Sequence, residues 1–344
     1  MKVYVVLGED CNFSCRYCLQ KPNMAGEIGR MSANYDKLIP FLGAVASSKE
    51  DSILLWGGEP FLYWGAFQEL VLAIRKYSQD VKIGTVTNGS LLTRNKVDFL
   101  NRHRVGVGLS HDGVATPITR GCDVFTYRDL RDTFLALNQK AISCVVSSLN
   151  QDIYRDIWGY YDGLLGPSVH VNLEFIKDCN QAGLAHFDYK RLAQTFDEIA
   201  EKFLSGVRQG RADSREFAFF LPFIQRLHNL QNTPEALRFP SCGAMLRTMN
   251  TDLEGCLYLC HNSDTVLGDV SDLPAAREKF EDYNTYCKRP KCKACAYFPL
   301  CGGGCPMQRE ESNRLSCEVH KILYSHVFRA LGVLAKEGQG DGGV

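Results

Sequence analysis

The sequence has no excess of charge of either sign, because its 39 basic and 39 acidic side chains cancel. Such a balance gives no long-range attraction to nucleic acid or to an anionic membrane, so neither is expected as a partner. The sequence also lacks a long apolar run at its beginning, where only the five residues VYVVL precede Gly8. That run is too short for a signal peptide or a membrane span. We therefore predict a cytoplasmic protein.

The cysteine positions also do not form the pattern of a disulfide framework. The 15 cysteines are an odd number at uneven spacing, in a chain without an export signal. Twelve of them fall in two groups, within residues 11–18 and 242–317. The others, Cys122, Cys144 and Cys179, fit as small buried apolar side chains. The grouping predicts metal binding.

Short β-rich runs alternate with longer amphipathic stretches in the first half of the chain. The candidate strands are residues 3–7, 52–56, 82–87, 105–110, 142–148 and 169–175. The candidate helices between them are residues 33–47, 64–78, 94–102, 127–139 and 151–164. This alternation predicts an α/β fold whose parallel sheet is curled by right-handed crossovers into a full or partial barrel.

The second half changes in composition. A helical stretch over about residues 189–230 is followed, from Cys242, by a region rich in Cys, Gly and Pro that needs staples because it has few core-forming runs. A last helix is expected over residues 317–336. The predicted parts are a barrel at 1–185, a helical connection at 186–240, a cysteine-rich domain at 241–336 and a flexible tail at 337–344.

The first cysteine group lies on one short loop, GEDCNFSCRYCLQ, directly after the first candidate strand. Cys11, Cys15 and Cys18 have the spacing C-x3-C-x2-C, so their thiolates can converge on one object. A zinc site would lack a visible fourth ligand. An iron–sulfur cube with three protein ligands leaves one iron open, and that iron can chelate a small molecule.

This loop resembles the cluster-binding signature of radical S-adenosylmethionine (SAM) enzymes, including the aromatic Tyr17 before its last cysteine. Further motifs follow candidate strands in the order typical of that family. They are WGGEP at 56–60, TNGSLL at 87–92 and LSHDG at 109–113, in which His111 replaces the usual Leu. Taken alone, WGGEP would predict only a Gly-Gly turn. Together, the motifs imply a partial (β/α)6 TIM-like barrel with its site at the carboxyl ends of the strands.

The resemblance implies that Cys11, Cys15 and Cys18 hold a [4Fe-4S] cluster whose open iron binds SAM. Further cofactor contacts are implied for Tyr17, Gly57, Gly58, Glu59, Thr87, Asn88 and Ser110. Ser110 is expected to hold the cofactor carboxylate together with a downstream arginine. Arg120, Arg128 and Arg131 are the candidates, and Arg131 is the residue we select.

The second cysteine group resembles the seven-cysteine SPASM domain of radical enzymes that modify peptides and proteins. The matching positions are Cys242, Cys260, Cys292, Cys295, Cys301, Cys305 and Cys317. The resemblance implies two auxiliary iron–sulfur clusters, expected to be [4Fe-4S]. One would be held by Cys292, Cys295, Cys301 and Cys317, and the other by Cys242, Cys260 and Cys305. A zinc ribbon would explain Cys292 and Cys295 but not the remaining cysteines.

The second auxiliary cluster lacks an obvious fourth ligand. In anaerobic sulfatase-maturating enzymes a cysteine six residues after the match of Cys242 provides it, and here that residue is Thr248. The spare thiols Cys256 and Cys287 either close the site or leave it open to substrate. We select Cys256, which would reach the metal of Cys260 if the chain turns tightly after Gly255.

The resemblance implies an enzyme that uses a 5′-deoxyadenosyl radical to abstract hydrogen from a peptide and modify it oxidatively, by a crosslink, a thioether or a similar bond. The alternative within the family is a sulfatase-maturating enzyme that forms formylglycine. The alternative of another class is a non-catalytic iron–sulfur electron carrier or scaffold. Against the maturase stands His261, because those enzymes carry Asp directly after the cysteine that matches Cys260.

His261 is therefore the candidate catalytic base, because an imidazole with an ordinary pKa of about 6.5 accepts a proton near neutral pH. A backbone hydrogen bond is the structural alternative for this side chain. The expected partners are a peptide or protein substrate and a reductant such as flavodoxin or ferredoxin. The first strand begins at Val3 and leaves no room for a leader-binding domain, so a separate recognition protein or the barrel mouth would grip the peptide.

Overall fold

The computed structural model describes residues 1–20, 35–46, 50–177, 183–232, 245, 247–283, 290–305 and 310–340. Its strands are β1 (Lys2–Val6), β2 (Ser52–Trp56), β3 (Lys82–Thr87), β4 (Val105–Ser110), β5 (Lys140–Val146), β6 (His170–Phe175), β7 (Thr248–Asp252), β8 (Cys256–Tyr258) and β9 (Val266–Asp269). Its helices are α1 (Leu38–Val45), α2 (Trp64–Tyr77), α3 (Arg94–Arg102), α4 (Thr116–Thr119), α5 (Leu130–Leu135), α6 (Tyr160–Leu165), α7 (Tyr189–Arg208), α8 (Arg215–Asn232), α9 (Leu273–Tyr283), α10 (Pro290–Lys293), α11 (Phe298–Cys301) and α12 (Glu310–Gly340).

The strands form one sheet, in the order β6-β5-β4-β3-β2-β1-β7-β8-β9 among the described residues. β1 to β6 are parallel in sequence order, which confirms the predicted α/β partial barrel. β7 adds to β1 in parallel, and β8 and β9 continue antiparallel. The cysteine-rich half therefore extends the sheet of the barrel, which the composition of that half did not indicate.

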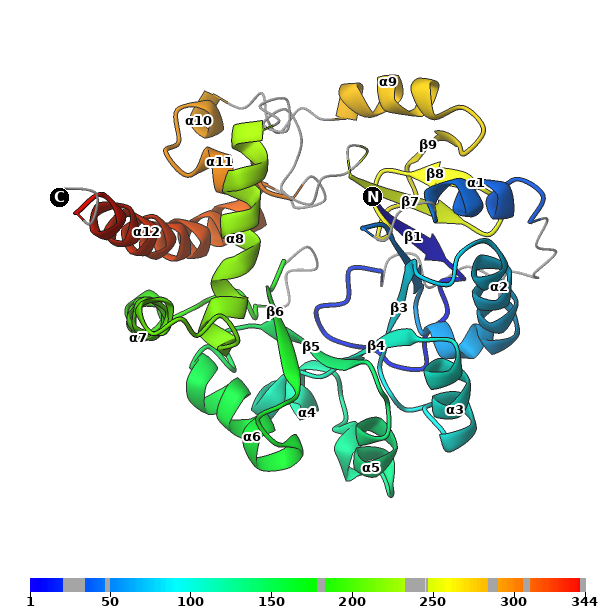
Figure 1. Ribbon diagram of the computed structural model, residues 1–344, viewed down its shortest axis with the longest axis horizontal. Coiled ribbons are helices and arrows are strands. Elements are labelled where there is room, and N and C mark those ends of the chain that lie inside the picture. Colours follow the sequence, from blue (N-terminus) through cyan, green and yellow to red (C-terminus); the bar gives the residue numbers. More distant parts are fainter. Residues whose placement is uncertain are drawn as a thin grey trace.

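Alternation along each strand decides which face lies inside the barrel. In β1, Val3 and Val5 are fully buried toward the helices, while Tyr4 between them is partly exposed on the other face. The same alternation recurs in β2, where Ile53 and Leu55 are buried. Figure 1 shows α1 to α6 around the outside of an open arc of strands, with α7, α8 and α12 grouped at its β6 end.

The helices that cover the sheet are amphipathic and locally capped. In α2 the buried residues recur at three- and four-residue spacing, as in Phe67, Leu70, Val71 and Ile74. Thr93 caps α3 by accepting from the backbone N–H of Lys96, and Asp188 caps α7 by accepting from that of Arg191.

The region between the barrel and the second cysteine group is two helices rather than one stretch. α7 and α8 pack on each other through the stacked rings of Phe203 and Phe220, whose centroids lie 4.3 Å apart. α12 packs along α7 and continues to Gly340, where Glu337 pairs with Arg208. The expected flexible tail thus begins inside a helix. Among the described residues, no helix has the length and apolar character to cross a membrane.

Candidate functional site

The loop after β1 carries Cys11, Cys15 and Cys18, all partly buried and free of disulfides. Burial raises the pKa of Cys15 to about 11; Arg120 lowers it, and Cys18 and Cys11 raise it by their proximity. This mutual influence places the three thiols together at the carboxyl end of β1. Within the described ranges, no three side chains of His, Cys, Asp or Glu converge closely enough to bind one single metal ion.

The glycine turn after β2, at Gly57 and Gly58, is hydrogen-bonded to this loop. The backbone N–H of Gly58 donates to the carbonyl oxygen of Gly8 at 3.0 Å, and that of Glu59 donates to Asp10 at 2.8 Å. A Cβ at Gly58 would lie 2.2 Å from the oxygen of Asp10, and Gly57 has a φ of 153°. Only glycine allows the two loops to approach so closely. The turn therefore positions the loop that carries Cys11, Cys15 and Cys18, which we call the cluster loop.

Glu59 joins the glycine turn to the motif after β3. Its carboxylate is 1% exposed and accepts from the hydroxyl of Thr87 at 2.7 Å and from the backbone N–H of Asn88 at 2.7 Å. The amide of Asn88 in turn donates to Asn12 in the cluster loop at 2.8 Å and lies 4.0 Å from the sulfur of Cys11. The side chains of Glu59 and Thr87 are therefore hydrogen-bonded to each other.

Asp112, in the motif after β4, ties the far end of the cluster loop to the barrel. Its fully buried carboxylate accepts from the hydroxyl of Tyr17 at 2.6 Å, from Thr119 at 2.7 Å and from the backbone of Val145 at 3.0 Å. Arg120 adds a fork of two bonds, each of 3.0 Å. Although burial opposes the charge, this guanidinium holds the pKa of Asp112 below its ordinary value.

The loop that carries Asp112 also needs a glycine. Gly113 has a φ of 60°, and a Cβ there would lie 2.3 Å from the carbonyl oxygen of Asp156 in the π-helical turn η5 (Ile153–Gly159). His111 is fully buried beside it, bonded to Tyr161 at 2.8 Å and to Asp123 at 3.0 Å. His111 therefore serves the packing of this loop.

The structure brings none of the three candidate arginines to Ser110 as a free cation. Arg120 is committed to Asp112, with its guanidinium over the ring of Tyr17 at 5.4 Å. Arg128 is 95% exposed. Arg131 lies on α5 and donates to the carbonyl oxygen of Leu164 on the outer surface. The selection of Arg131 is therefore not supported by its position, because a side chain outside the sheet does not reach the inner face where Ser110 lies.

The inner face of the sheet carries small side chains. The register pairs Gly84 with Gly106, and Ser110 with Ser143, at the partly exposed inner positions of β3, β4 and β5. At the end of β2, Trp56 has a buried Nε1–H without a partner among the described residues. A buried donor without an acceptor is costly, so this face is suited to a polar guest.

His261 lies against this inner face from the cysteine-rich half. Its ring stacks on Tyr4 at 4.4 Å, meets Trp56 edge to face at 4.8 Å and bonds to the side chain of Asn250 at 3.1 Å. Burial lowers the pKa of His261 to about 4, an effect that Glu174 opposes and Lys177 adds to. The expectation of an ordinary pKa is therefore wrong, and the backbone bond proposed as the structural alternative is replaced by a side-chain bond and ring stacking.

Four thiols of the second group lie together. Burial raises the pKa of Cys301 to about 11. The thiols of Cys317, Cys292 and Cys295 raise this pKa as well, whereas a hydrogen bond from the backbone lowers it. They come from α10, α11, the turn between them and the early part of α12. This is the set that the SPASM resemblance assigns to one cluster.

The other auxiliary set is only partly described. Cys242 and Cys287 lie outside the described residues, whereas Cys260 and Cys305 are partly buried. The tight turn at Gly255 comes before β8, so Cys256 begins an extended strand that ends at Tyr258, two residues before Cys260. The pKa of Cys256 is raised first by burial and then by Asp252. The assignment of Cys256 as the fourth ligand stays a prediction.

Reading the sequence missed Asp112 and the inward-facing aromatic residues Tyr4 and Trp56. The motif LSHDG contains Asp112, and its place directly after a candidate strand was the available signal. Tyr4 and Trp56 look like ordinary strand residues in the sequence, since only the curvature of the sheet assigns them to the inner face.

Replacing Gly58 with Ala should displace the cluster loop, because its Cβ would overlap the Asp10 carbonyl. We expect a loss of about 3 kcal/mol of stability and of about four irons per chain after anaerobic reconstitution. Thermal unfolding and iron analysis measure both. Gly65→Ala in α2 is the control, because no atom lies within 4 Å of its Cβ. Equal behaviour of the two variants would contradict this role of the glycine turn.

Asp112→Asn should destabilise the protein by about 3–5 kcal/mol, because it leaves Arg120 buried without a counter-charge. Asp162→Asn removes the exposed pair with Arg215 and should cost about 0–1 kcal/mol. The folded pKa of Asp112 is depressed, so its contribution is complete above its unfolded value of about 3.9 and is lost as the pH falls through the folded value. If the two variants lose the same free energy of unfolding at pH 7, the anchoring role of Asp112 is refuted.

Comparison with known proteins agrees with this geometry. Residues 5–149 match the model of the radical SAM superfamily. Among curated proteins, the chain is 23% identical to the radical SAM cyclopropyl synthase TigE of Paramaledivibacter caminithermalis, over 93% of this chain and 72% of that protein. It is 26% identical to the cysteine-type anaerobic sulfatase-maturating enzyme of Clostridium perfringens, over 93% of this chain and 94% of that protein.

Among solved structures, anSMEcpe with bound AdoMet and the Cp18Cys peptide covers 97% of this chain and 98% of its own, with a TM-score of 0.71 and 18% identity. SuiB of Streptococcus suis bound to its precursor peptide SuiA covers 88% of this chain and 71% of its own, with a TM-score of 0.58 and 15% identity. These likenesses confirm the fold. The match over residues 5–149, together with the cysteine loop and the motifs tied to it, identifies a radical SAM domain in the barrel.

Proposed function

We propose that the chain oxidatively modifies a peptide by a radical mechanism, with a crosslink or thioether as the product. The observation that carries this proposal is the second group of thiols, Cys292, Cys295, Cys301 and Cys317, on the segment from α10 to α12, in which α11 packs on α8 and α12 on α7. An auxiliary cluster offers a place for the second electron that a substrate radical must lose. Peptide-bound structural neighbours with the same fold over nearly the whole chain support a peptide as the substrate.

The residues present fit the cofactors of this reaction. Cys11, Cys15 and Cys18 would hold the radical [4Fe-4S] cluster, since three thiols on one loop leave one iron open. SAM would lie on the inner face among Gly57, Gly58, Asn88 and Ser110, where side chains are small. The unpartnered Nε1–H of Trp56 offers a donor there to cofactor or substrate. Tyr17, Glu59 and Thr87 would act on the cofactor indirectly, by holding the loops that carry it.

When bound, the reduced cluster and SAM supply a 5′-deoxyadenosyl radical that takes a hydrogen atom from the substrate. The chain orients the reacting groups through three fixed loops: the glycine turn, the Asn88 loop and the Asp112 loop each bond to the cluster loop or its backbone. Tyr4, Trp56 and His261 add aromatic surface to the same inner face, which helps to exclude water.

The auxiliary clusters belong to the same proposal. Cys292, Cys295, Cys301 and Cys317 would hold one, and Cys242, Cys260 and Cys305 the other, whose fourth position is open or filled by another thiol. The proposal also includes a flavodoxin or ferredoxin as the reductant and a separate peptide-recognition partner. It places the reaction in the cytoplasm.

A second candidate is the formation of formylglycine. The likeness to the Clostridium maturase over 94% of that protein supports it. The Cp18Cys peptide tests it directly: conversion of its cysteine to an aldehyde, detected by hydrazide capture and mass spectrometry, favours the maturase. Intact peptide together with SAM cleavage favours a crosslinking enzyme.

The radical step is tested with the reconstituted, dithionite-reduced protein and SAM alone. Wild type should form 5′-deoxyadenosine and hold about twelve irons. Replacing Cys11, Cys15 and Cys18 together with Ala should abolish the nucleoside and remove about four irons, while the remaining clusters persist. Cys122→Ala is the control, because that thiol lies outside both groups beside Tyr127. Zinc in place of iron, or an iron carrier that forms no nucleoside, would refute the proposal.

The catalytic role of His261 stays a prediction. His261→Ala should still form 5′-deoxyadenosine with the native peptide but yield little modified product if the side chain serves the reaction after hydrogen abstraction. His261→Phe keeps a ring between Tyr4 and Trp56 and separates stacking from chemistry. A purely structural role predicts that Phe restores iron content and product together.

A further inference from the structure

A tyrosine of α12, Tyr324, lies beside the thiols gathered on the segment from α10 to α12. These are the thiols of Cys292, Cys295, Cys301 and Cys317, which we call the four-thiol site. Tyr324 follows the last of these cysteines by seven residues in the same helix. Because seven residues make about two helical turns, both side chains project from one face of α12.

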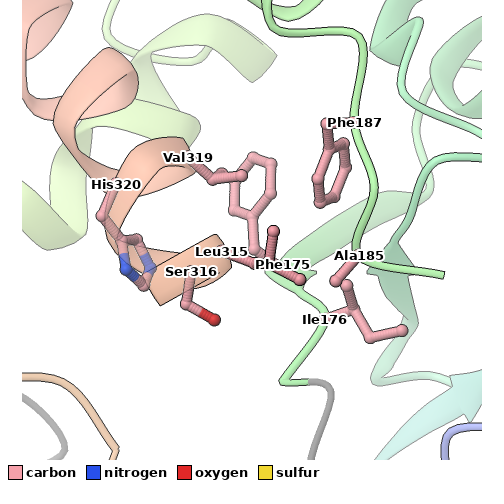
Figure 2. A pocket seen from close by; sticks show the side chains of 8 residues that line it. All are labelled: Phe175, Ile176, Ala185, Phe187, Leu315, Ser316, Val319 and His320. Carbon is pink, nitrogen blue, oxygen red and sulfur yellow. The ribbon is translucent and has the colours of Figure 1, made fainter. Parts of the chain in front are cut away.

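The ring of Tyr324 leans along α12 toward the four-thiol site. Long side chains of a helix point back toward its amino terminus, which is the direction of Cys317. The ring stacks on that of His320, one turn earlier, with centroids 5.4 Å apart and an angle of 4° between the planes. In Figure 2, Val319 lies next to the ring of Phe175, and His320 projects from the helix farther from that ring. Tyr324 therefore belongs to the side of α12 that carries His320, and the hydroxyl is at the end of the ring nearer to the thiols.

The loop that carries the other thiols packs on the same tyrosine. The ring of Tyr297, between Cys295 and Cys301, lies 6.5 Å from that of Tyr324. Backbone hydrogen bonds keep this loop tight. The N–H of Cys295 donates to the carbonyl oxygen of Cys292, and the N–H of Cys301 donates to that of Tyr297, both at 3.0 Å. Tyr324 is 6% exposed, so its ring is enclosed between the helix and this loop.

α8 covers a further side of Tyr324. The ring of Phe223 meets that of Tyr324 edge to face, with centroids 5.8 Å apart. Nearly one turn further along α8, Arg226 donates from Nε to the carbonyl oxygen of Pro299 in α11 at 2.7 Å. The phenol ring is thus fixed by contacts from α8, from α12 and from the loop before α11.

The electrostatic surroundings of Tyr324 agree with this placement. Burial raises the pKa of Tyr324 above its ordinary value, and Cys301 raises it next. Arg226 lowers this pKa, and Cys317 raises it. Because the pKa is raised, the phenol keeps its proton near neutral pH and remains a hydrogen-bond donor. A donor is therefore held beside two of the thiols.

We propose that Tyr324 donates a hydrogen bond to a sulfur atom of the four-thiol site and thereby raises the reduction potential of the auxiliary cluster held there. The proposal rests on the proposed peptide-modifying function, in which this site takes up the second electron of the substrate. Hydrogen bonds to sulfur are among the factors that set the potential of iron–sulfur clusters, because they stabilise the added negative charge of the reduced state. The chain already supplies one such donor, the backbone N–H of Gly303, which bonds to Cys301.

Tyr324→Phe tests the proposal, because it removes the hydroxyl and keeps the ring against Phe223, Tyr297 and His320. The measurement is a redox titration of the reconstituted full chain, followed by electron paramagnetic resonance of the reduced clusters. The three cysteines of the cluster loop are replaced by Ala in this protein, so that only auxiliary signals remain. We expect one midpoint to fall by a tenfold change in the equilibrium for reduction, which is about 59 mV for one electron. The other auxiliary midpoint should stay unchanged.

Tyr154→Phe is the matched control. The hydroxyl of Tyr154 donates to Glu216 at 3.0 Å, which is about 15 Å before Arg226 along α8. The control therefore loses the same atom away from the four-thiol site, and both midpoints should be those of the protein with Tyr154. If Tyr324→Phe loses iron, 3-fluorotyrosine at position 324 replaces it. That side chain has nearly the same shape and is a stronger donor, so the midpoint should rise.

A midpoint that does not move in a Tyr324→Phe protein with intact iron would overturn the proposal. Equal shifts of both auxiliary midpoints would also overturn it, because they report a general change rather than one hydrogen bond. Either result leaves the proposed function standing if the wild-type protein forms 5′-deoxyadenosine from SAM. If replacing all four cysteines of the four-thiol site with Ala removes no iron, no auxiliary cluster is held there, and the proposed function fails together with the role of Tyr324.

Discussion

The buried carboxylate of Asp112 is the point on which the geometry of the site depends. It receives the hydroxyl of Tyr17 from the cluster loop, the fork of Arg120 from the end of α4 and the backbone of Val145 from β5. A charge without exposure is tolerated only when its hydrogen-bonding capacity is filled, and here the bonds come from separate segments. Each segment is therefore fixed relative to the others, and the thiols of the loop are held where β1 ends. Glu59 does the same at the other end of the loop, through Thr87 and Asn88.

Local pattern was sufficient for most of the barrel. β2, β3 and β4 begin and end where alternation predicts, and α3 is bounded by Thr93 as its cap, because these segments satisfy their hydrophobic periodicity and their backbone hydrogen bonds with near neighbours. β7 could not be predicted in this way. Its partner is β1, nearly 250 residues earlier in the chain, and its own sequence TMNTD has little apolar character. α12 also exceeds its expected length, since packing on α7 supports turns that a glycine-rich end would not hold alone.

At the site, cysteine spacing identified the groups of thiols, because ligand spacing on a short loop is a local property. The roles of the arginines were harder to predict from the sequence. Three candidates follow Ser110 within about twenty residues, and their roles depend on which face of the sheet each helix covers. Arg120 is drawn into the interior by Asp112, while Arg131 is left outside. The low pKa of His261 likewise arises first from burial, and the rings of Tyr4 and Trp56 that contact it come from strands far away in the sequence.

The joined sheet also relates the two cysteine groups to each other. β7 pairs residue for residue with β1, from Lys2 with Thr248 to Val6 with Asp252, and the cluster loop leaves from the end of β1. A parallel pairing fixes both the direction and the register of the second strand. Because a shift of one residue would turn Asn250 away from the face on which it meets His261, this register also sets the ring that lines the barrel. β7 to β9, and with them Cys256 and the loop of His261, are thus held to the strand that leads into the loop of Cys11, Cys15 and Cys18.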